Sequence, residues 1–151
     1  MIPVMSRLMG KAKKLCASKP AGFQKIRAEP LVVIVVPTRE LAMQTWDEAR
    51  RMCYRSMLRP CVVYGGMPMG MTFDDLGKGC DVLVATPGRL CDLMDKPHIL
   101  SMSRVKYASL RPLATIRHVL TSLQVHDHRR GRRDAPVRLG GGAAQDHVGW
   151  R

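Results

Sequence analysis

The chain has 151 residues, enough for one ordinary domain, and its 25 lysines and arginines outnumber its 12 aspartates and glutamates. The resulting net charge of +13 favours a polyanionic partner such as nucleic acid; the alternative is that the charge only keeps the chain soluble. Every apolar run is shorter than the roughly 18 residues of a membrane span, and the first one is too short for a secretory signal peptide. We therefore expect an intracellular protein, either cytoplasmic or nuclear, with no membrane partner.

Cysteine usage agrees with that compartment. The five cysteines are odd in number, include no Cys-x-x-Cys pair and lie mostly in apolar segments: Cys16, Cys53, Cys61, Cys80 and Cys91. This pattern predicts reduced, buried thiols rather than disulfides or a zinc site.

The composition changes abruptly near residue 107. All methionines and cysteines precede residue 103, whereas the chain from Ala108 onward contains no Lys, Glu, Met, Cys, Phe or Tyr and holds four of the five histidines. A folded domain rarely changes composition so completely, so we expect two segments of different origin, residues 1–107 and 108–151.

The first elements lie before residue 54. Residues 2–9 are consistent with the end of a helix, and the basic, polar stretch 11–30 predicts a loop. The unbroken aliphatic run 31–36 predicts a strand buried on both faces, as in a parallel sheet. Thr38 is a candidate N-cap for the helix that follows. Its inward face is predicted by apolar and small residues at helical spacing: Leu41, Ala42, Thr45, Trp46, Ala49, Met52 and Cys53.

The same alternation continues to residue 107. Residues 61–64 predict a second strand that ends at a Gly-Gly pair, 73–76 a short helix, and 81–86 a third strand. Pro87 can open another helix with Leu90, Leu93 and Met94 facing inward, and residues 105–107 begin a fourth strand that is cut short. Strand alternating with helix predicts an α/β fold, a three-layer sandwich around a parallel sheet.

Polar and glycine residues follow three of these strands. In parallel α/β sheets, ligands bind at the carboxyl ends of the strands, where these residues lie. Each feature alone has an ordinary explanation, because a Pro-Thr pair is usually a helix cap and a Gly-Gly pair a turn. Together they supply hydroxyls, guanidinium groups and accessible backbone, which suit a sugar–phosphate chain. The candidate residues for contact with a nucleic-acid backbone are Thr38, Arg39, Gly65, Gly66, Thr86, Gly88 and Arg89.

These residues lie in motifs that resemble a known family. PTRELA (residues 37–42), the Gly65-Gly66 pair and ATPGRL (residues 85–90) are similar, in order and spacing, to three RNA-contacting motifs of the DEAD-box ATP-dependent RNA helicases. The resemblance implies part of the first RecA-like domain of such a helicase. It also implies that the seven candidate residues hold single-stranded or duplex RNA through its backbone, while Glu40, Leu41 and Ala42 are mainly structural.

The ATP-hydrolysing motifs of that family have no counterpart in the sequence. No G-x-x-x-x-G-K-[ST] phosphate loop occurs, and Gly77-Lys78-Gly79 lacks the hydroxyl residue. The Asp-Glu-Ala-Asp element, which would bind magnesium, should follow Tyr107 within a few residues, but Ala108-Ser-Leu-Arg stands there. We therefore expect no catalytic, metal-binding or cofactor-binding residue in this chain and no ATP turnover by it alone, although the complete family uses ATP and Mg²⁺.

Residues 108–151 allow two interpretations. A back-translation of residues 125–149, read one base later, contains Asp-Glu-Ala-Asp followed by an acidic amphipathic stretch, which favours an intron-derived and out-of-frame segment. The alternative is a real basic tail whose Arg/Gly cluster at 129–133 contacts phosphates. Either way we expect an irregular or disordered C-terminal tail.

Three functions remain open at this point. The first is a fragment of a DEAD-box helicase that keeps the RNA-contact motifs but not the ATP-hydrolysis motifs. The second is a non-enzymatic, sequence-neutral RNA-binding module, and the third is a non-functional truncated product. Because the sheet would lack the strand that bears the phosphate loop, exposed apolar edges predict poor solubility or partial folding.

Overall fold

The computed structural model describes residue 16, residues 26–110 and residues 138–139. Strands and helices alternate as expected, in the order β1 (Val32–Val35), α3 (Arg39–Cys53), β2 (Pro60–Val63), α4 (Met69–Gly77), β3 (Val82–Ala85), α5 (Pro87–Met94), β4 (Tyr107–Leu110) and β5 (Arg138–Leu139). The expected helix over residues 2–9, the loop up to residue 25 and most of the expected tail lie outside the described residues. Within the described residues, no helix is long and apolar enough to cross a membrane.

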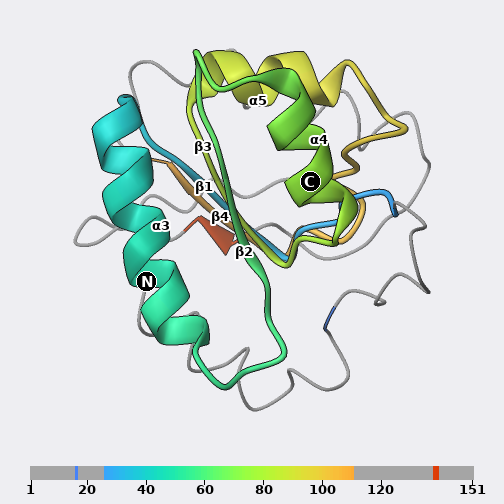
Figure 1. The fold of residues 1–151 in the computed structure, drawn as a ribbon. Helices are drawn as coiled ribbons and strands as arrows, with labels where there is room; N and C mark the ends of the chain where they lie inside the picture. The colour runs from blue at the N-terminus through green and yellow to red at the C-terminus, as the bar shows by residue number, and fades with distance from the viewer. Residues whose placement is uncertain (1–15, 17–25, 111–137, 140–151) are drawn as a thin grey trace, which may run out of the picture.

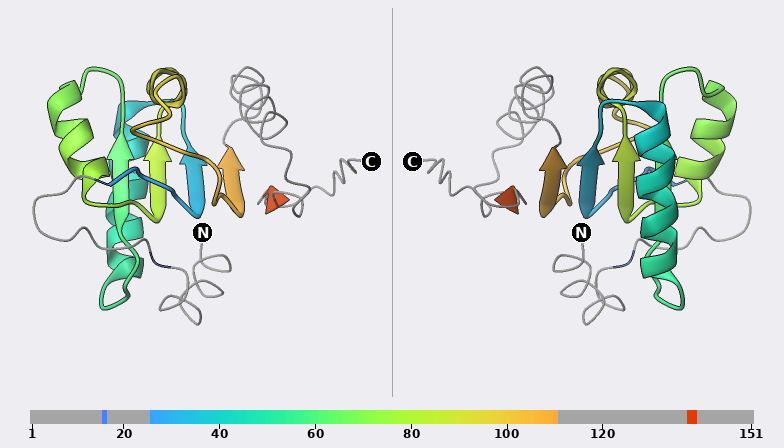
Figure 2. Two further views of the ribbon diagram at one scale, coloured as in Figure 1. Left: turned by 90° about the vertical axis from the view of Figure 1, so that its right-hand side faces the viewer. Right: turned by 90° about the vertical axis from the view of Figure 1, so that its left-hand side faces the viewer.

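The strands form one parallel sheet in the order β2-β3-β1-β4-β5. All four pairings are parallel, with Val33 opposite Leu83 of β3 on one side and Ala108 of β4 on the other. Figure 2 shows the arrows of β1, β2, β3 and β4 in the same direction, so that the carboxyl ends of these strands meet at one edge. The predicted α/β fold with a parallel sheet is therefore confirmed.

Helices cover both faces of the sheet. Alternate residues of each strand point to opposite faces. Val33, Val35 and Leu83 pack with Leu76 of α4 and Leu90 of α5. On the opposite face, the side chains of α3 pack against β1 and β3: Ala42, Ala49 and Cys53 with Val32, Ile34, Val82 and Val84. Figure 1 shows the resulting three layers, with α3 on one side and α4 and α5 on the other.

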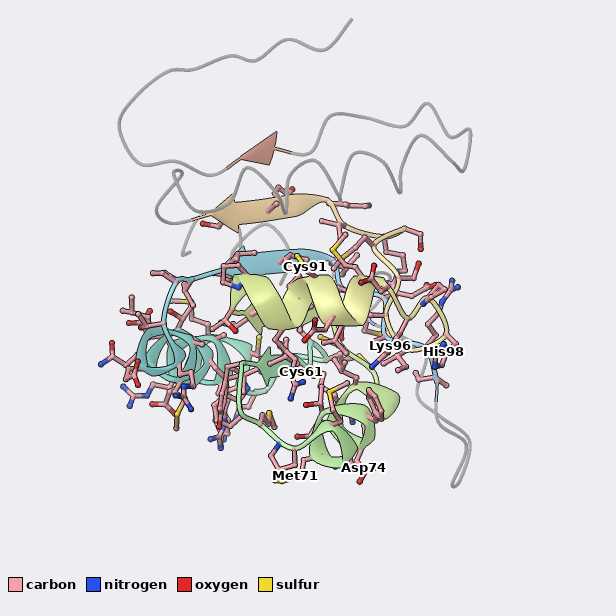
Figure 3. All side chains as sticks on the ribbon, turned by 90° about the horizontal axis from the view of Figure 1, so that it is seen from above. Cys61, Met71, Asp74, Cys91, Lys96 and His98 are labelled. Carbon is pink, nitrogen blue, oxygen red and sulfur yellow. The ribbon has the colours of Figure 1, made fainter. Side chains whose placement is uncertain are left out.

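A cation–π contact ties α4 to the end of α5. The ammonium nitrogen of Lys96 lies 5.6 Å from the centre of the Phe73 ring. Figure 3 shows Lys96 and His98 beyond the end of α5 and beside α4, whose Met71 and Asp74 face outward. The two helices on this face are thus joined at one end as well as through the sheet.

The fourth strand differs in its bounds from the prediction. It begins at Tyr107 rather than Val105 and continues to Leu110, pairing with β1 along its whole length. Ala108 is buried. Two more residues of the expected irregular tail, Arg138–Leu139, pair with β4 as β5. Hydrogen bonds from the backbone N–H groups of Lys106 and Tyr107 to Leu31 O start the β1–β4 pairing, which explains why the strand begins where it does.

Helix α3 also shows one difference. Thr38 caps it as predicted, and Ala42, Ala49 and Cys53 are buried. Leu41, however, was expected on the inward face and is 43% exposed. Successive helical residues are about 100° apart around the axis, so Leu41 lies to one side of the stripe that Ala42 occupies.

The five cysteines are thiols rather than disulfide partners, as the sequence predicted, but Cys16 and Cys91 are only partly buried. Cys53, Cys61 and Cys80 are buried among apolar side chains. Burial raises the pKa of the Cys53 thiol to about 11 and raises that of Cys80 well above its ordinary value. These thiols are therefore protonated at neutral pH and are poor nucleophiles.

Candidate nucleic-acid interface

The seven candidate residues lie together in one shallow groove. The groove occupies the carboxyl ends of β1, β2 and β3 and has a volume of about 660 Å³. Its remaining wall residues are Pro37, Glu40 and Pro87. Segments far apart in the sequence thus form a single surface at the sheet edge where a ligand was expected.

Thr38 and Arg39 position the first part of the groove at the start of α3. The Thr38 hydroxyl oxygen accepts a hydrogen bond from the Leu41 backbone N–H at 3.3 Å, and the extended backbone of Thr38 is that of an N-cap. The hydroxyl proton is still available to a phosphate oxygen. Arg39 is exposed, and its side chain has no hydrogen bond or ion pair with another described residue. Its guanidinium group can therefore approach an anion directly.

The Gly65-Gly66 turn lies directly against Arg39. Gly66 has φ +89°, a left-handed conformation that residues with a side chain rarely adopt. A Cβ atom at this position would also lie only 3.0 Å from Nη1 of Arg39. The left-handed backbone therefore favours glycine at this position, and a side chain here would displace the Arg39 guanidinium from its place beside the turn.

A hydrogen bond joins the glycine turn to the third motif. The backbone N–H of Gly65 donates to the Thr86 hydroxyl oxygen at 3.2 Å, and the N–H of Thr86 donates to Val63 O at 3.0 Å. Thr86 is only 8% exposed. It was expected to donate its hydroxyl to RNA; the structure adds that it holds the neighbouring turn, and its hydroxyl proton is not used by either bond.

Arg89 has contacts that the sequence did not predict. It is half-buried, and its Nη2 group donates to the Met67 carbonyl oxygen while Nη1 contacts the Met69 sulfur. Its Nε is buried and has no partner among the described residues. Arg89 therefore anchors the chain that follows the glycine turn. No local sequence signal could have shown this, because its partners lie 20 and 22 residues away and carry no charge.

The electrostatics of the groove favour anions without being uniformly positive. The N-termini of α3 and α5 both open into it, and their unpaired N–H groups and helix dipoles carry partial positive charge. Arg39 and Arg89 add two full charges, while the Glu40 carboxylate in the wall opposes them. The backbone at Gly88 is open, since a Cβ there would have no atom within 4 Å. Within the described residues, no group of three or more His, Cys, Asp or Glu side chains could hold a metal ion.

Comparisons with known proteins agree with this geometry. The family model described as DEAD/DEAH box helicase matches residues 2–110. The crystal structure of the yeast DEAD-box splicing factor Prp28 superposes with a TM-score of 0.65 at 24% identity, over 74% of this chain and 27% of that one. A hypothetical ATP-dependent RNA helicase from Sulfolobus tokodaii gives a TM-score of 0.53 at 29% identity, over 63% of this chain and 29% of that one. The chain thus spans less than a third of each of these proteins, and the matches confirm the RecA-like fold.

Proposed function

The chain belongs to the DEAD/DEAH box helicase family, and on that premise we propose that its groove holds RNA by the sugar–phosphate backbone without reading the base sequence. The observation that carries the proposal is the placement of all seven motif residues in one groove at the carboxyl edge of the sheet. Contacts to phosphates and sugars fix a nucleic acid in place but carry no sequence information directly.

Arg39 makes the main contact with the phosphate anion in this proposal. Its guanidinium is exposed, rests on Gly66 and is free to donate two parallel hydrogen bonds to a phosphate. Thr38 adds a hydroxyl donor beside it. Arg89 contributes charge, but two of its nitrogens already serve the Met67–Met69 segment, so it acts first by holding the wall of the groove in shape.

Fluorescence anisotropy with a fluorescein-labelled oligouridylate tests the proposal. We expect an affinity that a mixed-sequence RNA of equal length shares and that falls steeply with salt concentration. Arg39→Ala should weaken binding about tenfold or more, because a hydrogen bond between charged groups contributes about 1.5–3 kcal/mol. Arg51→Ala is the matched control, because it removes the same charge from the other end of α3.

Binding through charge alone gives a different result. In that case Arg39→Ala and Arg51→Ala weaken binding equally and slightly, and neutralising the arginine cluster at 129–133 has an effect as large as that of Arg39→Ala. Such a result would contradict the groove proposal and support non-specific attraction. The cluster itself lies outside the described residues.

ATP is not part of the proposed activity of this stretch. The 151 residues contain neither the phosphate-loop pattern nor an Asp-Glu-Ala-Asp element, the groups that would hold the triphosphate and its magnesium ion. We expect the same RNA affinity in Mg²⁺ alone and in Mg²⁺ with ATP. Tighter RNA binding in ATP would show that the chain holds the nucleotide by other means.

The origin of residues 108–151 stays a prediction. Sequencing of the transcript across the codons for residues 105–145 tests it directly. An in-frame Asp-Glu-Ala-Asp element after removal of residues 108–124 would show that the same gene also encodes an active helicase. Codons that encode the tail as written would leave RNA binding as the proposed function.

A further inference from the structure

A second hollow lies at the opposite end of α3 from the groove. It has a volume of about 590 Å³ and is formed by the last two turns of the helix and the segment that leads into β2. At about 1.5 Å per residue, the helical residues that line it, from Trp46 to Cys53, lie about 10–21 Å along the axis from Arg39. The end of α3 that forms it lies toward the amino ends of the strands (Figures 1 and 2). The hollow shares no residue with the groove.

The floor of this hollow is apolar. Cys53 and Leu58 are each 4% exposed, and Pro60 closes the far side. Burial raises the pKa of the Cys53 thiol to about 11, so the thiol is neutral and adds no charge. The Trp46 indole N–H donates to Pro60 O at 3.3 Å, which fixes the ring along one wall. An inserted side chain would therefore meet apolar surface and a rigid aromatic ring.

The rim is aromatic and positively charged. Tyr54 is 73% exposed, although large aromatic side chains are usually much more buried. Guanidinium carbons lie over both rings, with Arg50 at 4.7 Å from the centre of the Trp46 ring and Arg55 at 5.5 Å from that of Tyr54. These cation–π contacts hold two positive charges at the edge of the apolar floor.

The charge of the rim is only partly balanced. Asp47 is the one carboxylate in the lining, and it lies 2.7 Å from Arg51 and 4.0 Å from Arg50. Asp47 and the buried Asp81, whose charge acts on the Cys53 thiol, are two carboxylates against Arg50, Arg51 and the adjacent Arg55, so positive charge is in excess. Arg55 also has φ +58°, a left-handed conformation that costs a non-glycine residue about 1 kcal/mol or more. The charged side chain is therefore held over Tyr54 where a glycine would fit without strain.

We propose that this hollow, lined by Trp46, Arg50, Cys53, Tyr54 and Leu58 and flanked by Arg55, binds an acidic peptide segment of a partner protein. One apolar side chain of the peptide enters the hollow, and flanking carboxylates pair with Arg50, Arg51 and Arg55. Charge complementarity and the enrichment of aromatic and arginine residues both fit a protein interface.

RNA fits this surface less well than a peptide does. Bases bind single-strand sites by stacking on open aromatic faces. Here, guanidinium groups already cover one face of both rings, and Asp47 would oppose a phosphate chain in the lining. A carboxylate needs only the guanidinium donors, so a peptide can bind while the arginines stay over the rings. The inference does not depend on the groove and goes beyond the proposed RNA binding.

A labelled acidic peptide tests the inference. The probe is a short fluorescein-labelled peptide with one leucine between aspartates and glutamates, added to the full chain. The control is the same peptide with asparagine and glutamine in place of the acids. We expect saturable binding of the acidic peptide alone, and a change of Trp46 fluorescence in a Trp150→Phe background, where Trp46 is the one remaining tryptophan.

Two variants identify the surface without loss of the fold. Arg55→Gly removes one charge at a backbone position that glycine adopts without strain, and Arg50→Gln removes the other from an exposed helix face. Together they should weaken peptide binding about tenfold or more and leave oligouridylate binding unchanged. Arg39→Ala should do the reverse.

Each contrary outcome overturns the proposal. Unchanged peptide affinity in the double variant would show that the peptide binds elsewhere. Equal binding of the neutral peptide would show that charge plays no part. A loss of oligouridylate affinity in the double variant as large as that in Arg39→Ala would show that the hollow extends the RNA surface instead.

Discussion

Gly65 and Gly66 are neighbours that should respond very differently to the same substitution. Gly66 has φ +89°, and a Cβ there would lie 3.0 Å from Nη1 of Arg39. An alanine Cβ at Gly65 would have no atom within 4 Å, and its φ is not positive. The pair therefore separates the effect of a left-handed backbone from that of simply adding a methyl group in the same turn.

We expect Gly66→Ala to lower the free energy of unfolding by about 1–2 kcal/mol, the cost of a left-handed conformation for an L-residue. The clash itself should add little to this, since Arg39 is exposed and its guanidinium can move away. That movement should instead weaken RNA binding, because the guanidinium leaves its place beside the turn. Gly65→Ala should change the free energy of unfolding by less than about 0.5 kcal/mol.

Urea unfolding followed by far-ultraviolet circular dichroism measures the stability, and anisotropy with labelled oligouridylate measures the affinity. The two variants should have the wild-type dependence on urea, so that a shift in midpoint reports stability alone. Equal destabilisation by both alanines would refute the assignment of the cost to the left-handed conformation of Gly66. Unchanged RNA affinity in Gly66→Ala would refute the proposed link between this turn and Arg39.

Three further predictions concern single contacts. Thr86→Val removes the acceptor of the Gly65 N–H, so it should accelerate hydrogen exchange of that amide and destabilise the fold by about 1–3 kcal/mol. Thr86→Ser keeps the hydroxyl and should do neither. Equal exchange rates in the two variants would contradict this prediction. Asp81→Ala leaves the Arg59 N–H without the carboxylate that accepts it at 3.0 Å and should cost about 1–3 kcal/mol in urea unfolding, an effect absent if water replaces the carboxylate. Burial raises the pKa of Cys53 from 9.0 to about 11, so the thiol ionises at lower pH in the unfolded chain than in the folded one. The contribution of this thiol to the free energy of unfolding should be full below pH 9 and be lost between pH 9 and 11. The free energy of unfolding should fall less steeply with pH in Cys53→Ala, and an identical slope in that variant would contradict the prediction.

The sequence predicted the fold well because its central strands β1 and β3 are short and buried on both faces. A run such as residues 31–36 has no polar face, so it must lie in the centre of a covered sheet. Its exact limits were less predictable, since Leu31 and Val36 are buried like the strand residues but lie outside β1. The composition of a segment indicates whether it is buried, whereas the ends of a strand depend on which of its backbone groups form hydrogen bonds with the neighbouring strand.

The site was predictable only to the level of which residues gather there. Parallel strands bring their carboxyl ends together, so the position of three motifs after three strands was enough to place them in one groove. The internal contacts were not predictable from the sequence. The bonds from Gly65 to Thr86 and from Arg89 to Met67 depend on distances between separate loops. The hollow at the end of α3 was missed for a similar reason, since it needs Pro60 and Leu58 to approach Trp46.

The strand order has a consequence for how the groove comes into being. β1 and β2 follow each other in the chain, but β3 lies between them in the sheet, so neither is in its final place until β3 has formed. Pairings between strands distant in sequence form slowly, because a long loop must close before they add stability. A partly folded or partly synthesised chain that ends before residue 85 therefore has the PTRELA motif and the glycine turn without a surface to hold them together. Binding should appear in one step with the completed sheet, at the same urea concentration as the circular dichroism signal.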